Sequence, residues 1–228
     1  MIVSIHQPNF LPWIGYFNKL IQSDIFIILD SVQYPRGKTV ANHCQIKTAN
    51  GIQELVVPLS RKKNNDSLVS YNEIEFAEIY WYKKPLRSIN QAYSKAPYFN
   101  NYYEKLVEIF QNESFTNMNI EFIRFINKEL NTNTRLEILS NLENISNDRN
   151  QRIVDLCKKF NASKYLSGLG GKNYNDEVLF KQNSIDVIYT EYNFIKYPQL
   201  HGEFIPKLSI IDLLFNCGPD SKEYISEL

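Results

Sequence analysis

Two polar side chains suited to proton transfer and hydrogen bonding, His6 and Gln7, follow a short apolar segment at the N-terminus. Residues 2–6 are expected to form a strand, and Pro8 and Pro12 then stiffen the loop that follows it. An imidazole can exchange a proton near neutral pH, and a stiff loop holds it in place. The pattern predicts a preorganised site at His6. The alternative is a histidine that only satisfies hydrogen bonds at a strand end.

A second histidine, His201, stands two residues before Glu203 in a segment that also contains Tyr197 and Gln199. In extended backbone the side chains at i and i+2 point to the same side, so the Glu203 carboxylate can support a protonated His201. Such a pair is suited to amide formation, because an amine that attacks a carbonyl must lose a proton. The alternative is a loop histidine bonded to backbone groups.

A glycine-rich segment, residues 167–172, is expected to lie between a short strand and a helix. Glycines allow backbone amides to approach an anion closely, and a lysine at the end of the segment adds positive charge. The segment is neither a Walker loop nor a complete Gly-x-Gly-x-x-Gly fingerprint. It predicts a phosphate site, with a simple connector as the alternative. The residues assigned to it are Ser167, Gly168, Gly170, Gly171 and Lys172.

Three further polar side chains, Asp30, Gln33 and Arg36, follow a second apolar segment. A carboxylate, an amide and a guanidinium beside the first loop could bind sugar hydroxyls or a phosphate. For Asp30 a role in capping or in a turn is an equal alternative. No metal site is expected, since the three histidines are far apart and lack ligand spacing.

Charge and composition exclude several classes of protein. The chain has 25 Lys plus Arg and 25 Asp plus Glu, so its formal net charge is zero, which argues against a nucleic-acid partner. No signal-peptide pattern and no run of about 18 apolar residues is visible, so we expect a cytoplasmic protein without an integral membrane segment. The three cysteines, Cys44, Cys157 and Cys217, suggest neither disulfides nor zinc, and thioester catalysis is not favoured.

The elements that must position these side chains follow an α/β pattern. A strand at 2–6, a helix at 13–22 and a buried strand at 25–30 form a βαβ unit with a parallel strand pair. Segments 43–48 and 54–58 flank Ala49-Asn50-Gly51 and predict a hairpin. Three helices are expected near 80–93, 99–111 and 118–130.

The α/β pattern returns after residue 135. Strands are expected at 135–139, 164–166 and 185–190. Helices are expected from 147 or 148 to 160, from 175 or 176 to 182, and at 208–215, ended by Gly218-Pro219. We predict one α/β domain over residues 1–228, with a Rossmann-like parallel sheet, a β-hairpin and a helical insertion. Its core is about 1–35 and 135–228, the hairpin about 36–60 and the insertion about 78–131.

Six segments in fixed order resemble a known family. Residues 6–19 read His-Gln-Pro-Asn-Phe-Leu-Pro-Trp-Ile-Gly-Tyr-Phe-Asn-Lys, and residues 30–36 with Asn42 follow. The others are 96–99, 165–171, 197–204 and 208–219. This set resembles the WbqC-like protein family over essentially the whole chain.

The resemblance implies a role in surface polysaccharide or O-antigen synthesis, where family members are associated with attaching an amino-acid or acyl group to an amino sugar. The catalytic residues are then expected to be His6, His201 and Glu203. Substrate binding is assigned to the polar side chains of these segments, namely Gln7, Asn9, Tyr16, Asp30, Gln33, Arg36, Asn42, Tyr197 and Gln199.

A more distant similarity links the N-terminal βαβ unit to nucleotidyltransferase-like (HIGH-type) folds. His6-x-Pro8 and Gly15 at the start of a helix resemble that arrangement, although Tyr16 stands where a histidine is usual. Enzymes of this type bind ATP at the first turn, and some activate a carboxylate as an acyl-adenylate.

Three functions are therefore considered. The first is amide formation on a nucleotide-linked 4-amino-4,6-dideoxyhexose, with an amino acid or acyl group as donor, carried or not by a carrier protein. The second is activation of a carboxylate with ATP and Mg²⁺. The third is a noncatalytic sugar-nucleotide-binding partner in a polysaccharide assembly complex.

Overall fold

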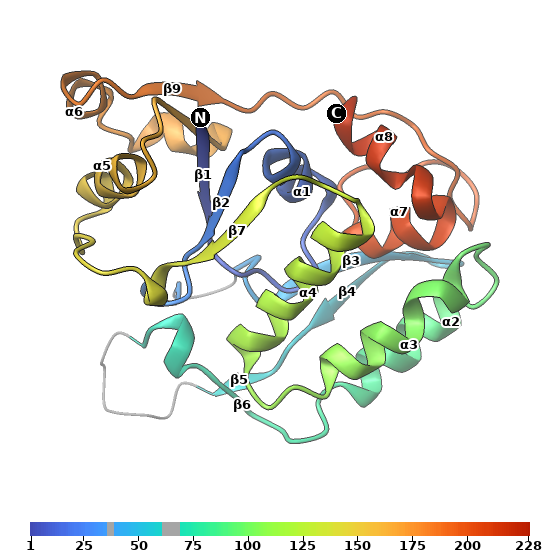
Figure 1. Cartoon of the computed structure of the whole chain (residues 1–228). Coiled ribbons are helices and arrows are strands. Elements are labelled where there is room, and N and C mark those ends of the chain that lie inside the picture. The colour runs from blue at the N-terminus through green and yellow to red at the C-terminus, as the bar shows by residue number, and fades with distance from the viewer. Residues whose placement is uncertain (36–38, 61–68) are drawn as a thin grey trace.

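A five-stranded parallel sheet forms the centre of the computed structural model, which describes residues 1–35, 39–60 and 69–228 (Figure 1). The sheet order is β7-β2-β1-β8-β9. Its strands are β1 (Ile2–His6), β2 (Ile25–Ile28), β7 (Arg135–Ile138), β8 (Lys164–Ser167) and β9 (Asp186–Tyr189). The predicted α/β class with a Rossmann-like parallel sheet is confirmed.

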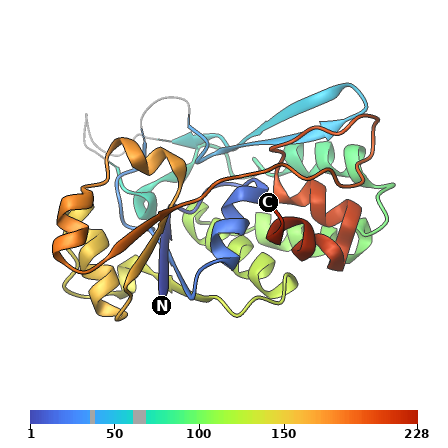
Figure 2. The same cartoon turned by 90° about the horizontal axis from the view of Figure 1, so that it is seen from above.

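Each face of the sheet packs against its own helices. Alternation along β1 and β2 sends Val3 and Ile27 toward α5 (Arg149–Lys159) and α6 (Glu177–Gln182). Phe26, next to Ile27, packs on the other side with α1 (Ile14–Ile21). Figure 2 shows α5 and α6 on one side of β1 and α1 on the other.

Local signals in the sequence account for the helix starts around the sheet. The Asp148 side chain accepts hydrogen bonds from the backbone amides of Asn150 and Gln151 and so caps α5. Asp176 caps α6 in the same way by accepting from the amide of Leu179. Both aspartates belong to the predicted capping pairs.

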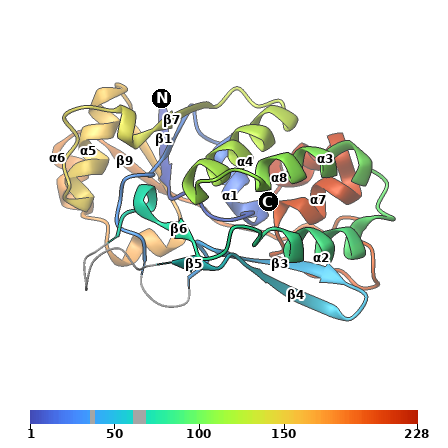
Figure 3. The same ribbon diagram turned by 90° about the horizontal axis from the view of Figure 1, so that it is seen from below.

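The hairpin and the helical insertion pack beside the sheet. Strands β3 (His43–Thr48) and β4 (Gly51–Val56) form the predicted antiparallel hairpin, although β4 begins at Gly51 and not at residue 54. Figure 3 shows the two strands alongside α2. The insertion contains α2 (Lys83–Tyr93), α3 (Phe99–Phe110) and α4 (Phe115–Glu129). Its apolar side chains share one core with α1 and with α7 (Ile210–Cys217).

Several elements differ from expectation. Helix α4 begins three residues earlier than predicted, because the Ser114 hydroxyl accepts from the Asn117 amide and caps it. The short pair β5 (Leu59–Ser60) and β6 (Glu75–Phe76) and the final helix α8 (Ser221–Ser226) were not predicted. The same is true of four short 3-10 helices, η1 (Tyr71–Glu73), η2 (Leu139–Asn141), η3 (Leu169–Asn173) and η4 (Gly218–Asp220). These elements are short, and the periodicity of a few residues carries little signal.

The end of α7 shows why Gly218 occupies that position. Its φ angle is +54°, a conformation that side chains disfavour. A Cβ atom there would also lie 2.5 Å from the Tyr98 ring. The helix therefore ends at Gly218-Pro219 as predicted, two residues beyond the expected last position 215. In the part of the chain that is described, no helix combines the length and apolar character needed to cross a bilayer.

Candidate functional site

The strand order reverses between β1 and β8, and a pocket opens there at the carboxyl ends of the strands. Chain connections run from β1 toward β2 and β7 on one side, whereas β8 and β9 lie on the other. Ligands of open α/β sheets bind at such a reversal. We call this cavity of about 380 Å³ the switch-point pocket. It is lined by Ile5, His6, Gln7, Trp13, Gly15, Tyr16, Lys19, Tyr165, Ser167, Gly168, Leu169, Gly170, Gly171, Tyr174 and Tyr192.

His6 ends β1 in this pocket as a neutral imidazole. Its Nδ1 lies 3.1 Å from the carbonyl oxygen of Gln7. A carbonyl can only accept, so Nδ1 carries the hydrogen and Nε2 keeps its lone pair. Burial of the ring lowers the pKa of His6 to about 3, and the charge of Lys19 adds to this. The ring also packs on Tyr16, with centroids 4.5 Å apart. His6 therefore offers Nε2 as a hydrogen-bond acceptor at neutral pH.

Lys19 is a site residue that the sequence analysis missed. Only 4% of it is exposed, and its Nζ donates a 2.7 Å hydrogen bond to the carbonyl oxygen of Ile5. Burial lowers its pKa to about 7, so the amine can gain or lose a proton near neutral pH. Lys19 follows Gly15 and Tyr16 by four and three residues, which puts the three on one face of α1. The available signal was a lysine on the same helix face as Tyr16, which was a site candidate.

The glycine segment after β8 forms η3 and one wall of the switch-point pocket. A Cβ atom on Gly168 or Gly170 would meet no atom within 4 Å, so both border open space. One on Gly171 would lie 2.1 Å from Ser167 Oγ, which makes this glycine necessary for packing. Lys172 is absent from the described lining of the pocket, and its Nζ lies 5.2 Å from the centroid of the Tyr189 ring. The segment lines the pocket, but its predicted lysine points elsewhere.

Alanine at Gly171 is expected to destabilise the protein by about 1–3 kcal/mol, because the new methyl group overlaps Ser167 Oγ and approaches Asn175 Nδ2. Alanine at Gly170 is the matched control, since it adds the same group where nothing lies within 4 Å. Urea unfolding of both variants measures the difference. Equal stabilities would contradict the packing role of Gly171.

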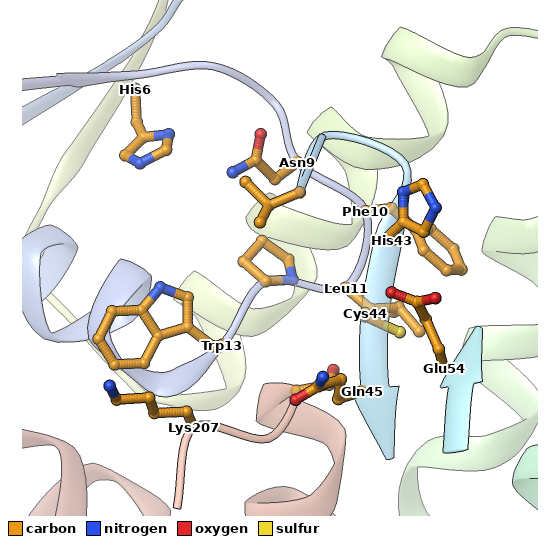
Figure 4. A pocket seen from close by; sticks show the side chains of 13 residues that line it. His6, Asn9, Phe10, Leu11, Trp13, His43, Cys44, Gln45, Glu54 and Lys207 are labelled. Carbon is orange, nitrogen blue, oxygen red and sulfur yellow. The ribbon is translucent and has the colours of Figure 1, made fainter. Parts of the chain in front are cut away.

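A second pocket lies between the N-terminal loop and the hairpin, and Figure 4 shows it from close by. This hairpin pocket has a volume of about 350 Å³. His6 and Trp13 line one side of it, and His43, Cys44 and Glu54 line the other. The remaining lining residues are Asn9, Phe10, Leu11, Pro12, Val40, Gln45, Lys207 and Ser209. Because His6 and Trp13 also line the switch-point pocket, the two cavities meet at these side chains.

The loop between the two pockets is held in a strained conformation. Leu11 is buried and has a φ angle of +39°, which is uncommon for a residue with a branched side chain. Trp13 packs edge-on against Tyr192, with ring centroids 4.9 Å apart. A Cβ atom on Gly15 would lie 2.2 Å from the Trp13 indole, so this glycine makes room for the ring. Strained backbone of this kind tends to occur where a loop must present specific groups.

A third pocket adjoins the switch-point pocket on its other side. This arginine pocket has a volume of about 460 Å³ and shares Ile5, Gln7, Tyr165 and Tyr174 with its neighbour. Its other lining residues are Leu29, Val32, Gln33, Asn147, Arg149, Arg152 and Ile153. The predicted site residues Gln7 and Gln33 therefore come together here. Arg149, which is exposed, and Arg152, which is half-buried, line the same pocket.

Two predicted substrate-binding residues make structural hydrogen bonds instead. The buried Asp30 carboxylate accepts from the backbone amide and the hydroxyl of Ser140, at 2.9 and 2.6 Å. This matches the capping alternative and leaves Asp30 out of the described pocket linings. Asn42 Nδ2 donates to the carbonyl oxygen of Val57 and helps to close the hairpin. Arg36 lies outside the described residues.

The predicted His201 and Glu203 pair belongs to a different part of the molecule. His201 Nε2 lies 2.7 Å from the carbonyl oxygen of Ala92 in α2, which corresponds to the backbone-bonded alternative. The backbone oxygen of Glu203 accepts from the buried amine of Lys47. Neither residue is among the described residues that line the pockets containing His6. The expected single site with two histidines is therefore not assembled.

Tyr197 and Gln199, from the same segment, also make structural contacts. The Tyr197 hydroxyl donates to Asp212 Oδ2 at 2.8 Å, inside the core. The Gln199 side chain accepts from Lys47 and exchanges two hydrogen bonds with the backbone of Ile205. These bonds fix the loop after β9 to the hairpin and to α7.

The three cysteines are free and buried. Burial raises the pKa of Cys44, which lines the hairpin pocket, and raises those of Cys157 and Cys217 to about 12. All three are protonated thiols at neutral pH and poor nucleophiles. Within the described ranges, no group of three or more His, Cys, Asp or Glu side chains is placed to hold a metal ion.

Comparisons with known proteins agree with the resemblance seen in the sequence. The model of the WbqC-like protein family matches residues 7–224. The uncharacterized protein Rv1507c of Mycobacterium tuberculosis is 33% identical over 227 residues, which cover 98% of this chain and 96% of that protein. No solved structure matches the chain significantly.

Proposed function

The chain belongs to the WbqC-like protein family, and on this premise we propose that it is an enzyme that joins two substrates at His6. The proposed reaction forms an amide on the amino group of a nucleotide-linked 4-amino-4,6-dideoxyhexose. The donor is an amino acid such as glycine, or an acyl group, in an activated form that a carrier protein can hold. The proposed setting is O-antigen or surface polysaccharide synthesis in the cytoplasm.

One observation carries this proposal, namely that two separate cavities meet at the His6 imidazole. The switch-point and hairpin pockets share His6 and Trp13. Their volumes of about 380 and 350 Å³ are each in the range of small-molecule sites. Holding two reactants on either side of one catalytic group is how enzymes turn a bimolecular reaction into a step within a complex.

The chemistry of each pocket suggests which substrate it takes. The switch-point pocket lies at the carboxyl ends of β1 and β8, where nucleotides bind in open α/β folds. We assign the nucleotide-linked amino sugar to it, with the sugar amine directed at His6. Phe10, Leu11 and Val40 give the hairpin pocket a more apolar lining, which suits an acyl group.

In the proposed step, the sugar amine attacks the carbonyl carbon of the donor. A C–N bond forms, the bond to the leaving group breaks, and a proton moves from the amine nitrogen to His6 Nε2. The low pKa of His6 in the free protein makes it a weak base. The negative charge of a bound nucleotide raises the pKa of a nearby imidazole, which would make His6 a stronger base.

The substrate class is supported by the family. Members of the WbqC-like family are associated with surface polysaccharide synthesis and with acylation of amino sugars. The two cavities that meet at His6 support the transfer of a group between two substrates. The identity of the acceptor as an amino sugar comes from the family.

A second candidate function is activation of a carboxylate with ATP and Mg²⁺. The observation that favours it is the strand reversal beside His6, combined with a glycine segment after β8, as in nucleotidyltransferase-like folds. Tyr16 lines the pocket where those enzymes carry a histidine. This function requires pyrophosphate release that depends on an acid substrate.

A ligand panel tests these functions directly. Thermal unfolding is measured with dTDP- and UDP-linked 4-amino sugars, with ATP and Mg²⁺, and with coenzyme A. A ligand at 100 times its Kd stabilises by about 2.7 kcal/mol. Stabilisation by an amino-sugar nucleotide, followed by a mass increase of the sugar in the presence of an acyl donor, is expected. Binding without turnover would favour a noncatalytic sugar-nucleotide-binding protein, and no binding would contradict the proposal.

A further inference from the structure

The arginine pocket contains two guanidinium groups one helical turn apart. Arg149 and Arg152 stand at the start of α5 and both line the cavity. Tyr174, which is shared with the switch-point pocket, lies under Arg149, with the guanidinium carbon 3.2 Å from the ring centroid. The ring holds Arg149 by a cation–π contact and leaves its N–H groups for another partner.

Arg152 is held in place by backbone oxygens. It is half-buried, its Nε donates to the carbonyl of Ser146 at 3.1 Å, and its Nη2 donates to that of Asn147 at 2.7 Å. These bonds use one side of the planar group, so N–H donors on the other side stay available. A fixed guanidinium with free donors is preorganised for a carboxylate or a phosphate.

Neither arginine has a carboxylate in direct contact with its guanidinium in the described part of the chain. No ion pair between either guanidinium and a carboxylate is formed there. The nearest acid in sequence, Asp148, accepts from two backbone amides as the cap of α5. Asp155 accepts from Ser146 and from Gln151. Burial lowers the pKa of Arg152, the charge of Asp148 acts in the opposite direction, and the charge of Arg149 adds to the lowering.

We propose that the arginine pocket is an anion subsite, in which Arg149 and Arg152 bind the phosphate groups of the substrate. The amides of Gln7 and Gln33, which also line this cavity, supply further hydrogen bonds. The evidence for this subsite is the position of the two arginines in the pocket and the contacts that hold them there. It rests on the proposed function only for the statement that a nucleotide diphosphate is the natural carrier of the phosphates.

Two lysines near these pockets, Lys172 and Lys19, are less suited to phosphate binding than the two arginines. Lys172 is directed at Tyr189 and lies outside the described lining of both cavities. Lys19 lines the switch-point pocket, but its amine already donates to Ile5 and loses its charge near neutral pH. Arginine keeps its charge at every physiological pH, so the pair on α5 is the permanent positive charge of the site.

The position of the subsite also fits the proposed geometry. Gln7, Tyr165 and Tyr174 line both cavities, so a ligand can extend from one to the other. With the diphosphate at the arginines, the sugar that it links to the nucleoside can extend into the switch-point pocket. One end of that ligand would then reach His6.

The test is calorimetric titration with inorganic pyrophosphate, UDP and uridine. We expect Arg149→Gln to weaken binding of pyrophosphate and UDP by about 10- to 100-fold, since it removes charge-assisted hydrogen bonds. Binding of uridine, which has no phosphate, is expected to stay unchanged. The matched control is Lys158→Gln, which removes one exposed positive charge from the same helix and should bind pyrophosphate like wild type.

Arg152→Gln serves as a second variant, and thermal unfolding of each protein checks that the fold is kept. Unchanged pyrophosphate binding in Arg149→Gln, an equal loss in Lys158→Gln, or no binding by wild type would overturn the subsite. Loss of pyrophosphate binding in Arg149→Gln supports it even if no amino-sugar nucleotide binds. In that case the proposed function fails while the subsite stands.

Discussion

Replacement of His6 by alanine is expected to lower the turnover number of the proposed amide-forming reaction by about 10²- to 10⁴-fold, with the fold retained. The reason is geometric, because His6 lies where the switch-point and hairpin pockets meet. Its Nδ1 is engaged by the carbonyl of Gln7, so Nε2 is the atom that can accept the proton of the attacking amine. Turnover is measured by mass spectrometry of the acylated sugar, and substrate binding by calorimetry.

Two further variants separate proton transfer from other effects. His6→Gln can place an amide oxygen near the position of Nε2, which can accept a hydrogen bond but cannot carry the proton away. It should bind substrate like wild type and remain slow. His43→Ala removes the other histidine of the hairpin pocket, whose Nδ1 lies 2.7 Å from the carbonyl of Thr39, and should cost less than about 10-fold. A wild-type rate in His6→Ala would rule out the proposed base.

Acid stability gives an independent check on the same substitution. The pKa of His6 is about 3 in the folded protein and near 6.5 in an unfolded chain. Between these values the unfolded state binds the proton that the folded state excludes, so stability falls as pH decreases from about 6.5 to 3. His6→Ala removes this term, so the variant should lose less stability than wild type across that range.

The elements of the fold were predictable because their signals are local. The strand at Ile2–His6 was predicted with its observed bounds, and the caps Asp148 and Asp176 mark the helices that they begin. A parallel sheet then follows from the strand–helix–strand order. For the same reason the positions of His6 and Gln7 at the carboxyl edge were predictable, since polar residues that end a parallel strand share that edge.

The role of the segment that contains His201 could not be read in the same way. Its polar groups are satisfied by Lys47 and by Ala92, which are more than 100 positions away in the chain. A histidine near a glutamate looks the same in sequence whether it faces a substrate or a helix end. Lys19 and Arg149 were not predicted as site residues, but the structure places both at a cavity. Their positions depend on how α1 and α5 pack against the sheet.

The largest effect on stability is expected from Asp212, which lies at the centre of a buried polar network. The carboxylate is fully buried and accepts from the hydroxyls of Tyr93 and Tyr197 at 2.7 and 2.8 Å. Burial raises the pKa of Asp212, whereas these two hydroxyls and the amine of Lys47 act in the opposite direction. Lys47, which is 1% exposed, in turn donates to Gln199 and to the backbone of the loop after β9.

Asp212→Ala would leave two buried hydroxyls without their acceptor and a buried ammonium without its nearby negative charge. We expect it to lower the free energy of unfolding by about 3–5 kcal/mol, measured by urea denaturation. Tyr197→Phe removes a single hydroxyl and should cost about 1–2 kcal/mol. Asp220→Ala is the matched control, since Asp220 is exposed and its side chain makes no capping hydrogen bond, so its effect should stay within about 0.5 kcal/mol.

The network also connects to the site, because the loop that it fixes continues into Lys207 and Ser209, which line the hairpin pocket. The amide of Ser209 donates to the carbonyl of Gln45 in β3, which joins that wall to the hairpin. Asp212→Asn keeps the shape of the side chain and should fold at low temperature with a loosened hairpin pocket. It should therefore raise the KM of the acyl donor more than that of the nucleotide sugar. An Asp212→Ala variant as stable as Asp220→Ala would contradict the role of Asp212 in stabilising this wall.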